Sequence, residues 1–224
     1  MSTGTASRSL AGHQGRWILL VLAAVLLAAA GWAVGQLSAP TSSTPAEGSP
    51  EAGFARDMQT HHLQAVDMSS LVRDRTEDPD IRRLAYDISR TQQQQAGQMY
   101  GWLSVWGLPQ ASSQPTMAWM DDGAQDHTSM PGMDSTTPGL DAQMPGMATA
   151  EQLAELEDAE GREAERLYLE LMIPHHQAGA IMAQAILDRT DNPVVTSLAQ
   201  PIATSQTSEI EYMADLLAER RTPS

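Results

Sequence analysis

The chain has 224 residues, a formal net charge of −15, no cysteine, and arginine at every one of its 13 basic positions. The acidity argues against nucleic acid as a partner, since phosphate binding needs clustered lysine and arginine. The absence of cysteine excludes disulfides, thiolate metal sites and cysteine nucleophiles. The length allows one domain of ordinary size together with additional segments.

The first signal along the chain is an uncharged apolar run at residues 17–37, which has the length of roughly 20 residues needed to span a bilayer. Arg8 and Arg16 precede it, and the positive-inside rule keeps residues 1–16 in the cytoplasm and sends the rest outside. The alternative is a signal peptide that is cleaved just after the run. Because the apolar core is long, we expect an uncleaved anchor and hence a single-pass protein of the cell membrane with an extracytoplasmic C-terminal domain.

An internal repeat dominates residues 53–224. The segment that begins at Asp57 aligns without a gap with the one that begins at Leu171, and the register holds as far as Leu103 and Leu217. The pairs with possible chemistry are Met58 with Met172, His61 with His175, His62 with His176, Met68 with Met182, and Met99 with Met213. The offset is far longer than any solenoid period, so the repeat is a duplicated unit rather than an array.

Each unit is predicted to be a helical hairpin, the first at residues 53–107 and the second at residues 149–224. Asp78-Pro79 and Asn192-Pro193 place a capping side chain before a proline at the first helical position, which ends one helix and starts the next. The sequence has no strand-length run of β-branched residues and no strict alternation of apolar and polar residues, so no strand is predicted. Two hairpins bury their apolar faces against each other, which predicts an all-α, ferritin-like four-helix bundle behind an N-terminal transmembrane helix.

The connecting segments set the expected helix starts. Residues 38–52 are rich in serine, threonine and proline and are expected to form a flexible tether, so the first helix should begin at Gly53. The third helix should begin at Thr149, which has a capping-box partner in Gln152. The connection at residues 108–148 is long, as the crossover of a ferritin-like bundle requires.

Histidine and methionine share one face of the first helix of each unit. At about 100° per residue, Met58, His61, His62 and Met68 fall in one sector with small apolar residues, so this face points inward. The second copy repeats the pattern with Met172, His175, His176 and Met182. A buried polar group without a partner costs about 1–3 kcal/mol, and a metal ion is one such partner. Satisfied core histidines and plain methionine packing remain the alternative.

The donor types indicate which metal to expect. Imidazole nitrogen with thioether sulfur suits a soft ion, Cu(I) above all, with Ag(I) as its mimic. Oxygen-seeking cations such as Mg²⁺ and Ca²⁺ are disfavoured. Met99 and Met213 on the second helices are candidates to complete the sites, with packing as the alternative. Glu209 is a candidate acceptor that orients a histidine, and Gln95 in the matching place leaves open that the two sites differ.

The connection between the hairpins supplies a second set of candidate ligands. Two Met-Pro-Gly-Met segments have the signature of a type II turn, which brings the first and fourth residues within about 7 Å. Because methionine exposed in a polar loop has no packing role, the loop is predicted to capture a soft metal ion. A trap for oxidants and a hydrophobic strip for a partner are the alternatives. The candidate loop ligands are His127, Met130, Met133, Met144 and Met147.

The segment from Met172 to Ala183, MIPHHQAGAIMA, resembles the ferritin-like family catalogued as domain of unknown function 305. The segment 57–68 is similar to a second, divergent copy, and the segment 206–213 is similar to the later motif of the family. The resemblance implies a helical bundle of bacterial envelopes, some members of which are implicated in copper or silver binding and resistance. Gln59-Thr60 and Gln95 depart from the Ile-Pro and Glu of the family pattern.

The sequence therefore predicts an extracytoplasmic protein that binds and buffers copper or provides tolerance to it, rather than an enzyme. A di-iron oxidase would need Glu-x-x-His motifs, which the sequence lacks, and no hydrolase nucleophile motif is present. The alternative is a metal-free helical interaction or structural module of the cell envelope. The expected partners are the metal ion, the membrane through the anchor, and an unidentified copper-handling protein.

Overall fold

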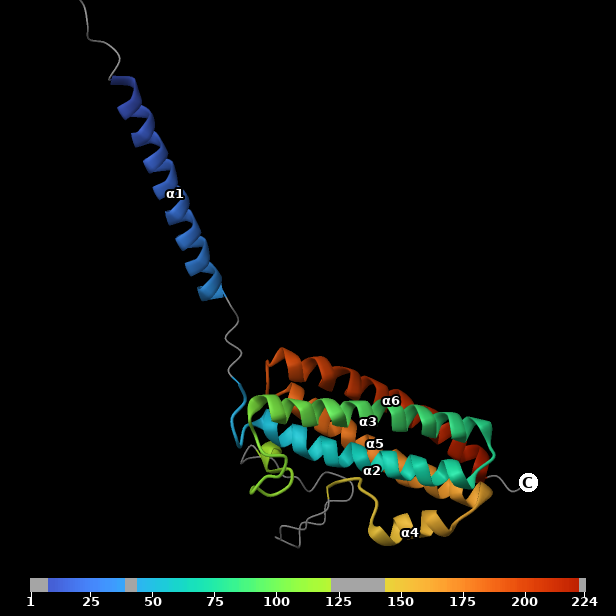
Figure 1. Cartoon of the computed structure of the whole chain (residues 1–224). Coiled ribbons are helices and arrows are strands. Elements are labelled where there is room, and N and C mark those ends of the chain that lie inside the picture. The colour runs from blue at the N-terminus through green and yellow to red at the C-terminus, as the bar shows by residue number, and fades with distance from the viewer. Residues whose placement is uncertain (1–7, 39–43, 122–143, 222–224) are drawn as a thin grey trace, which may run out of the picture. The chain divides into compact units, whose positions relative to one another are not determined.

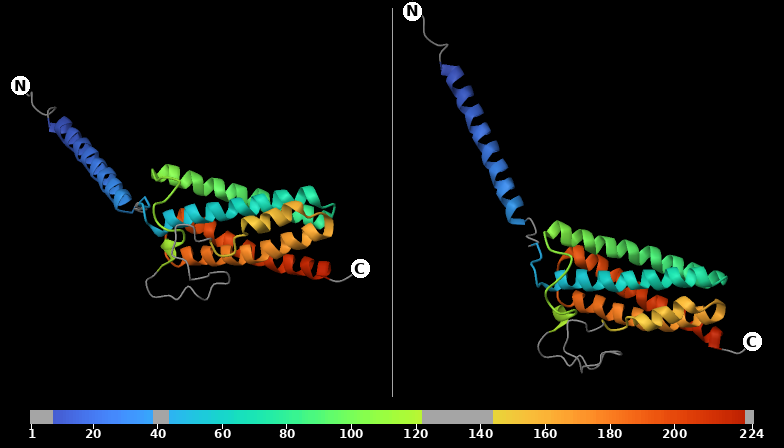
Figure 2. Two further views of the ribbon diagram at one scale, coloured as in Figure 1. Left: turned by 90° about the horizontal axis from the view of Figure 1, so that it is seen from below. Right: turned by 60° about the horizontal axis from the view of Figure 1, so that its bottom comes forward.

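The computed structural model describes residues 8–38, 44–121 and 144–221, and the chain divides into two units, Met1–Ser43 and Thr44–Ser224 (Figures 1 and 2). The first unit contains one helix, α1 (Arg8–Ser38). Its window Arg16–Ala33 is long and apolar enough to cross a membrane. A helix of this kind near an N-terminus serves either as a signal sequence or as a membrane anchor.

The second unit is a four-helix bundle built from two antiparallel hairpins (Figure 1). The long helices are α2 (Pro50–Arg75), α3 (Pro79–Trp106), α5 (Gly161–Leu187) and α6 (Pro193–Arg221), and the short ones are η1 (Ala118–Met120) and α4 (Ala150–Asp158). Helix α2 packs on α3, α5 packs on α6, and α2 and α5 join the two hairpins. The described parts of the chain contain no strand. The predicted all-α bundle of two duplicated hairpins is therefore confirmed.

The turn inside each hairpin is held by the other hairpin. The Thr76 hydroxyl donates to Glu165 on α5, and the Thr190 hydroxyl donates to Glu51 on α2. These two threonines and two glutamates occupy matched positions of the repeat. The contacts therefore repeat the internal duplication and fasten the hairpins together near both ends of the bundle.

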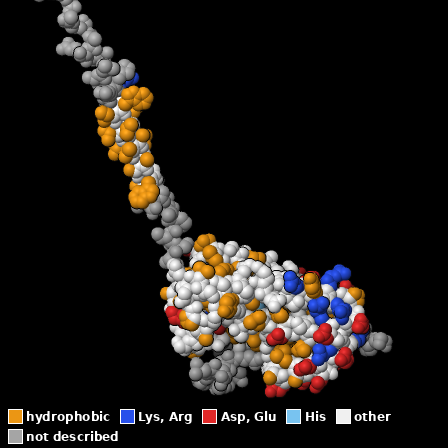
Figure 3. All heavy atoms as spheres, viewed as in Figure 1, with side chains coloured by type: hydrophobic (Ala, Val, Ile, Leu, Met, Phe, Trp, Pro, Cys, Tyr) orange, Lys and Arg blue, Asp and Glu red, His pale blue; other side chains and the backbone are white. Residues whose placement is uncertain are grey.

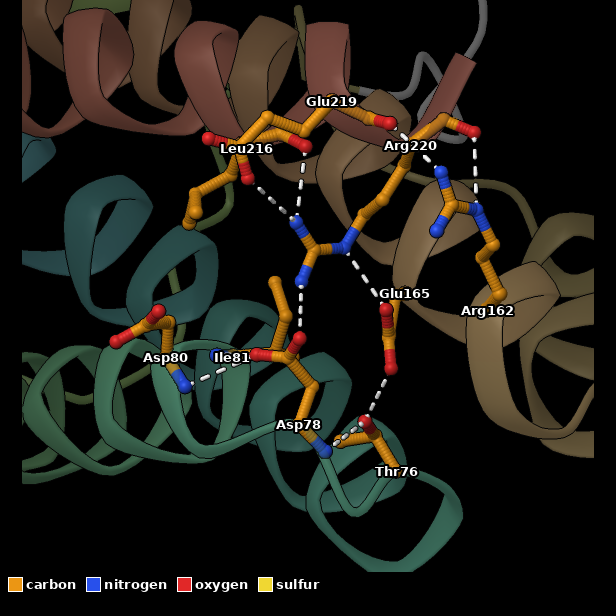
Figure 4. Close-up of polar contacts among 9 residues, drawn as sticks. All are labelled: Thr76, Asp78, Asp80, Ile81, Arg162, Glu165, Leu216, Glu219 and Arg220. Atoms are coloured by element: carbon orange, nitrogen blue, oxygen red, sulfur yellow. Dashed lines mark hydrogen bonds and ion pairs between the residues drawn. The ribbon is translucent and has the colours of Figure 1, made fainter. Parts of the chain in front are cut away.

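One end carries an additional buried ion-pair network, shown in Figure 4. The Arg220 side chain is only 5% exposed, and its guanidinium lies 2.8 Å from Glu165 Oε2 and 2.8 Å from Asp78 Oδ2. It also donates to the Leu216 carbonyl. Arg220 thus joins the last turn of α6 to the first helix of its own hairpin and to the turn of the other one.

Two helix boundaries differ from the prediction. Helix α2 begins at Pro50 rather than Gly53, because the Ser49 hydroxyl accepts from the Ala52 amide and proline fits the first helical position. Residues 50–52 of the predicted tether are therefore helical. Thr149 forms the predicted capping box, but its helix, α4, ends at Asp158. The predicted third helix is two helices, since the backbone is extended at residues 159 and 160 and Gly161 has a φ of +54°.

The buried side chains form two clusters along the bundle. One contains Phe54, Met58, Leu103, Ile186 and Ile202 among others, and the second contains Met68, Ile88, Tyr168, Leu169 and Leu217 among others. On α2 and on α5, the histidine pair lies between residues of the two clusters. The polar layer predicted from the repeat is thus enclosed by apolar packing.

Charge is distributed unevenly over the bundle. Residues 91–120 and 192–208 contain no aspartate, glutamate, lysine or arginine, which leaves the C-terminal half of α3 and the N-terminal half of α6 uncharged. Figure 3 shows the charged side chains gathered toward the opposite end of the visible face. Two of the four long helices, α3 and α6, are therefore uncharged over the half of the bundle on one side of its middle.

Candidate metal centre

Four histidines meet in the middle of the bundle, and none of them is exposed to solvent. The rings of His61 on α2 and His175 on α5 stack, with centroids 3.6 Å apart and planes inclined by 29°. The centroids of His61 and His62 are 6.4 Å apart, and those of His175 and His176 are 6.2 Å apart. The two histidine pairs of the repeat therefore converge in space.

The outer histidine of each pair is bonded to the second helix of its hairpin. His62 Nε2 lies 2.8 Å from Gln95 Oε1, and His176 Nε2 lies 2.8 Å from Glu209 Oε2. Because these oxygens accept, Nε2 is the donor in both rings, and Nδ1 is the nitrogen left to contact an ion. Gln95 and Glu209 occupy matched positions, so the two copies reach the same geometry with an amide in one and a carboxylate in the other.

Most of the ring nitrogens in this layer make no hydrogen bond. They are Nδ1 and Nε2 of His61, Nδ1 and Nε2 of His175, Nδ1 of His62 and Nδ1 of His176. Leaving a buried polar atom unpaired costs about 1–3 kcal/mol, so such a group of atoms is unusual in a folded core. Imidazole lone pairs without a partner are available to coordinate a metal ion.

Burial holds the imidazoles of His61, His62 and His175 in the neutral form. It lowers the pKa of His61 and of His175 well below the usual value, and the neighbouring histidines act in the same direction. Burial also lowers the pKa of His62 to about 3, although the hydrogen bond that His62 donates to Gln95 opposes the shift. Metal coordination requires neutral imidazole, so these side chains already have the protonation state of a ligand.

Methionine sulfurs flank the histidine layer on both sides. Met58, Met99 and Met182 belong to one core cluster, and Met68, Met172 and Met213 belong to the other. Each trio takes one residue from α2, one from α5 and one from α3 or α6. Within the described ranges, no group of three or more histidine, aspartate or glutamate side chains is placed to hold one ion.

Two buried glutamines complete the layer and were not assigned a role from the sequence. Gln92 Nε2 lies 3.5 Å from His176 Nε2. The matched Gln206 is 2% exposed, and neither of its amide atoms has a hydrogen-bond partner. It lies against Gly179, where a Cβ atom would be 2.2 Å from Gln206 Oε1. The sequence did contain a signal, because glutamine occupies both matched positions of the repeat, on α3 and on α6.

The described part of the methionine-rich connection is packed rather than exposed. The Met147 amide donates to the Met144 carbonyl over 3.2 Å and Gly146 has a φ of +75°, as the predicted turn requires. Met144, however, is 7% exposed and belongs to the cluster of Phe54 and Met58. The premise that loop methionines have no packing role is wrong for Met144, and Met147 is half-buried. The other candidates, His127, Met130 and Met133, lie outside the described residues.

A second part of the connection is also fixed to the bundle. Asp57 on α2 accepts from the Met117 amide over 2.8 Å and from Trp119 Nε1 over 2.9 Å. Burial raises the pKa of Asp57 despite these hydrogen bonds. Met117 and Met120 are both buried in the core cluster that contains Met58. These methionines therefore have a structural role in closing one end of the bundle.

The chain is similar to a known protein family and to proteins of known structure. A family model, Domain of unknown function (DUF305), matches residues 51–217. A DUF305 protein from Streptomyces coelicolor is 48% identical with a TM-score of 0.66, and the match covers 77% of this chain and 94% of that one. A DUF305 fragment from Deinococcus radiodurans is 31% identical with a TM-score of 0.59, covering 78% and 99%.

Two further similar proteins are the metal-bound protein CopM and a viral protein. The protein CopM in its Cu(II)-bound form is 26% identical with a TM-score of 0.54, covering 78% of this chain and 99% of that one. CopM has also been solved in Cu(I)-bound and Ag-bound forms. Protein L153 of Acanthamoeba polyphaga mimivirus is 40% identical over 57 residues, which are 25% of this chain and 38% of the viral protein.

Proposed function

Since the chain belongs to the DUF305 family, we propose that its bundle binds a soft metal ion, copper(I) first and silver(I) as its mimic, and buffers that ion. The ligands would come from the histidine layer and from the methionines that flank it. The proposed set is Met58, His61, His62, Met68, Met99, Met172, His175, His176, Met182 and Met213. The ion is cargo, and no catalytic residue is assigned.

The observation that carries the proposal is the group of buried imidazole nitrogens in the histidine layer that make no hydrogen bond, including both nitrogens of His61 and of His175. Neutral imidazole with thioether sulfur is a donor set for a soft cation, and hard cations take oxygen instead. CopM, which was solved with bound copper, has the same fold at 26% identity. Both points favour copper over an oxygen-seeking metal.

The stack of His61 and His175 has to open for both rings to bind one ion. Lone pairs of imidazole nitrogens lie in the ring plane, and stacked rings present their faces to each other. Rotation of one ring about its side chain would turn a nitrogen toward the other half of the layer. We therefore propose that binding of an ion separates the two rings.

The N-terminal helix α1 is proposed to be retained as an anchor, so that the bundle acts outside the cytoplasmic membrane. The window Arg16–Ala33 has the length and composition of a membrane span, and Arg8 and Arg16 favour a cytoplasmic N-terminus. His127, Met130 and Met133 remain proposed donors that capture the ion before it reaches the bundle. The partner that supplies or receives the ion would be a copper-handling protein of the envelope.

One observation favours a second candidate, a metal-free interaction module of the envelope. Among the described residues, histidine and carboxylate side chains alone do not form a group of three around one point. In that case the stacked rings would be core packing and the unpaired nitrogens a tolerated cost. The two candidates differ in whether the chain competes for copper at all.

The proposal is tested by anaerobic titration of the full chain in detergent micelles with Cu(I), in competition with a chromogenic chelator. A variant with His61, His62, His175 and His176 changed to alanine is titrated beside it, together with a variant in which Met130 and Met133 are changed to serine. Tight binding that is lost only in the histidine variant supports the bundle as the site. A wild-type chain that fails to compete with the chelator rejects the proposal and leaves the interaction module.

A further inference from the structure

We infer that the two halves of the histidine layer hold a soft cation with unequal affinity, and that Glu209 makes its half the tighter one. The inference rests on the proposed function. The glutamate half is His176, Glu209 and Met213, and the glutamine half is His62, Gln95 and Met99. In each half, the acceptor and the methionine lie one turn apart on the second helix of a hairpin.

The two halves share their geometry and differ in charge. The acceptor oxygen lies 2.8 Å from Nε2 of the histidine in both. Gln95 lies within the uncharged residues 91–120, and Glu209 directly follows the uncharged residues 192–208. The two copies of the repeat therefore differ in the acceptor of the histidine, which is neutral in one copy and negatively charged in the other.

That charge affects a buried cation directly. A cation held by neutral imidazole and thioether ligands keeps an uncompensated positive charge in a low-dielectric core, which is unfavourable. A carboxylate bonded to the liganding histidine offsets this charge and makes the imidazole a stronger donor. A glutamine in the same place orients the ring but supplies no charge. The glutamate half should therefore load first.

One pair of buried side chains next to each half also differs in polarity between the two copies. Tyr168 and Ser69, whose hydroxyl oxygens are 3.1 Å apart, are buried in or beside the cluster of the glutamate half. Their counterparts in the repeat are Phe54 and Ala183, which belong to the cluster of the glutamine half. A hydroxyl pair thus lies on the side of Glu209, where the glutamine half has apolar side chains.

The test is calorimetric titration of the full chain in detergent micelles with Ag(I), which has the charge of Cu(I) and is not oxidised by air. Four chains are compared: wild type, Glu209→Gln, Gln95→Glu, and the double swap Glu209→Gln/Gln95→Glu. Wild type should show two classes of bundle site that differ by at least about tenfold, the lower bound of the effect of removing such an acceptor. Glu209→Gln should weaken the tight class by about 10–100-fold, and Gln95→Glu should strengthen the weak class by a similar factor.

The double swap is the matched control for the single variants. It should restore two unequal classes and exchange their locations. His176→Ala should remove the tight class from wild type but the weak class from the double swap, and His62→Ala should do the reverse. Donors in the connection between the hairpins are the same in all chains, so their contribution does not change across the set.

Three outcomes would overturn the inference while leaving the proposed function standing. They are equal affinities in the wild-type bundle, a tight class that is unchanged by Glu209→Gln, and a bundle that holds only one ion. Wild-type chain that binds no silver would reject the proposed function itself. Far-UV circular dichroism of each silver-free variant identifies any that fail to fold, and a gain of affinity in Gln95→Glu cannot come from misfolding.

Discussion

The imidazole rings of His61 and His175 stack at a centroid distance of 3.6 Å, and neither ring makes a hydrogen bond through its nitrogens. The two residues are equivalent positions of a duplicated sequence, contributed by the two helices that join the hairpins. Stacking is compatible with a metal-free core, whereas coordination needs the ring edges. Under the proposed function, the relationship between these two side chains should therefore change when the chain binds an ion.

Loading the chain with Ag(I) should break this stack. Each ring now shields the protons of the other, so the imidazole resonances of His61 and His175 should shift when the rings separate. Proton NMR of the full chain in micelles, before and after one to two equivalents of Ag(I), measures the effect, and assignment uses His61→Gln and His175→Gln. Binding that leaves both sets of resonances in place would show that these rings are not ligands.

The stability of the metal-free chain should depend on the buried imidazoles. Burial lowers the pKa of His61, His62 and His175 in the folded state, to about 3 for His62, while the unfolded chain titrates near 6.5. The unfolded state thus binds more protons below pH 6.5. The stabilising contribution is complete above pH 6.5 and is lost as the pH falls toward the folded pKa, by at most about 1.4 kcal/mol per pH unit for each histidine.

Denaturant unfolding of the metal-free chain between pH 6.5 and 4.5 measures this loss. The double variant His61→Gln/His175→Gln removes two of the titrating groups and should show a shallower decline in unfolding free energy. Equal slopes for the two chains would contradict the assignment of neutral buried histidines.

Arg220 should contribute strongly to stability because its ion pairs are buried. Changing it to alanine leaves Glu165, whose side chain is 10% exposed, without its cationic partner, and removing one member of a buried pair costs about 3–5 kcal/mol. The neighbouring Arg221 is the matched control, since it is 62% exposed and pairs with Glu170 on the surface. Arg221→Ala should cost less than about 1 kcal/mol. Chemical denaturation compares the two, and similar losses would contradict the buried network.

The turn at Met144–Met147 should tolerate no side chain at Gly146. Its φ is +75°, and a Cβ atom there would lie 2.5 Å from the Pro174 carbonyl oxygen and 2.7 Å from Ala178 Cβ. Gly146→Ala should therefore destabilise the chain by about 1–3 kcal/mol, through backbone strain and overlap with α5. Thermal unfolding of the variant measures the change.

Gly97→Ala is the control for this substitution. Gly97 lies within α3, and a Cβ atom there would meet nothing within 4 Å. Alanine in a helix interior is favoured over glycine by about 0.5–1 kcal/mol, so the variant should be slightly more stable than wild type. A loss of stability in both variants would remove the case for a specific turn packed on α5.

Much of the bundle follows from local signals in the sequence. The duplicated spacing of Met58 and His61 predicted that both histidine pairs face one core, and the Asp78-Pro79 and Asn192-Pro193 steps predicted the turns of the hairpins. Glu209 was found because it lies four residues before Met213 and so shares its side of the helix. These features depend on helical periodicity and capping chemistry, which are readable along the chain.

Other features depend on packing between distant segments. The burial of Met144 results from its contact with a cluster formed by other helices, which its polar neighbours in sequence do not indicate. The break at residues 159–160 separates two segments with favourable helix composition, and it is seen in the extended backbone of these two residues and in the positive φ of Gly161. The stack of His61 on His175 depends on how closely α2 and α5 approach, which no spacing within either helix encodes.

The most direct test of the account is copper K-edge X-ray absorption of the full chain loaded anaerobically with one equivalent of Cu(I). A site in the bundle predicts a coordination shell with both imidazole nitrogen and thioether sulfur, and the nitrogen contribution should disappear when His61, His62, His175 and His176 are changed to alanine. A shell of sulfur alone in wild type, unchanged by the histidine substitutions, would place the ion among methionines without the histidine layer and contradict the central claim.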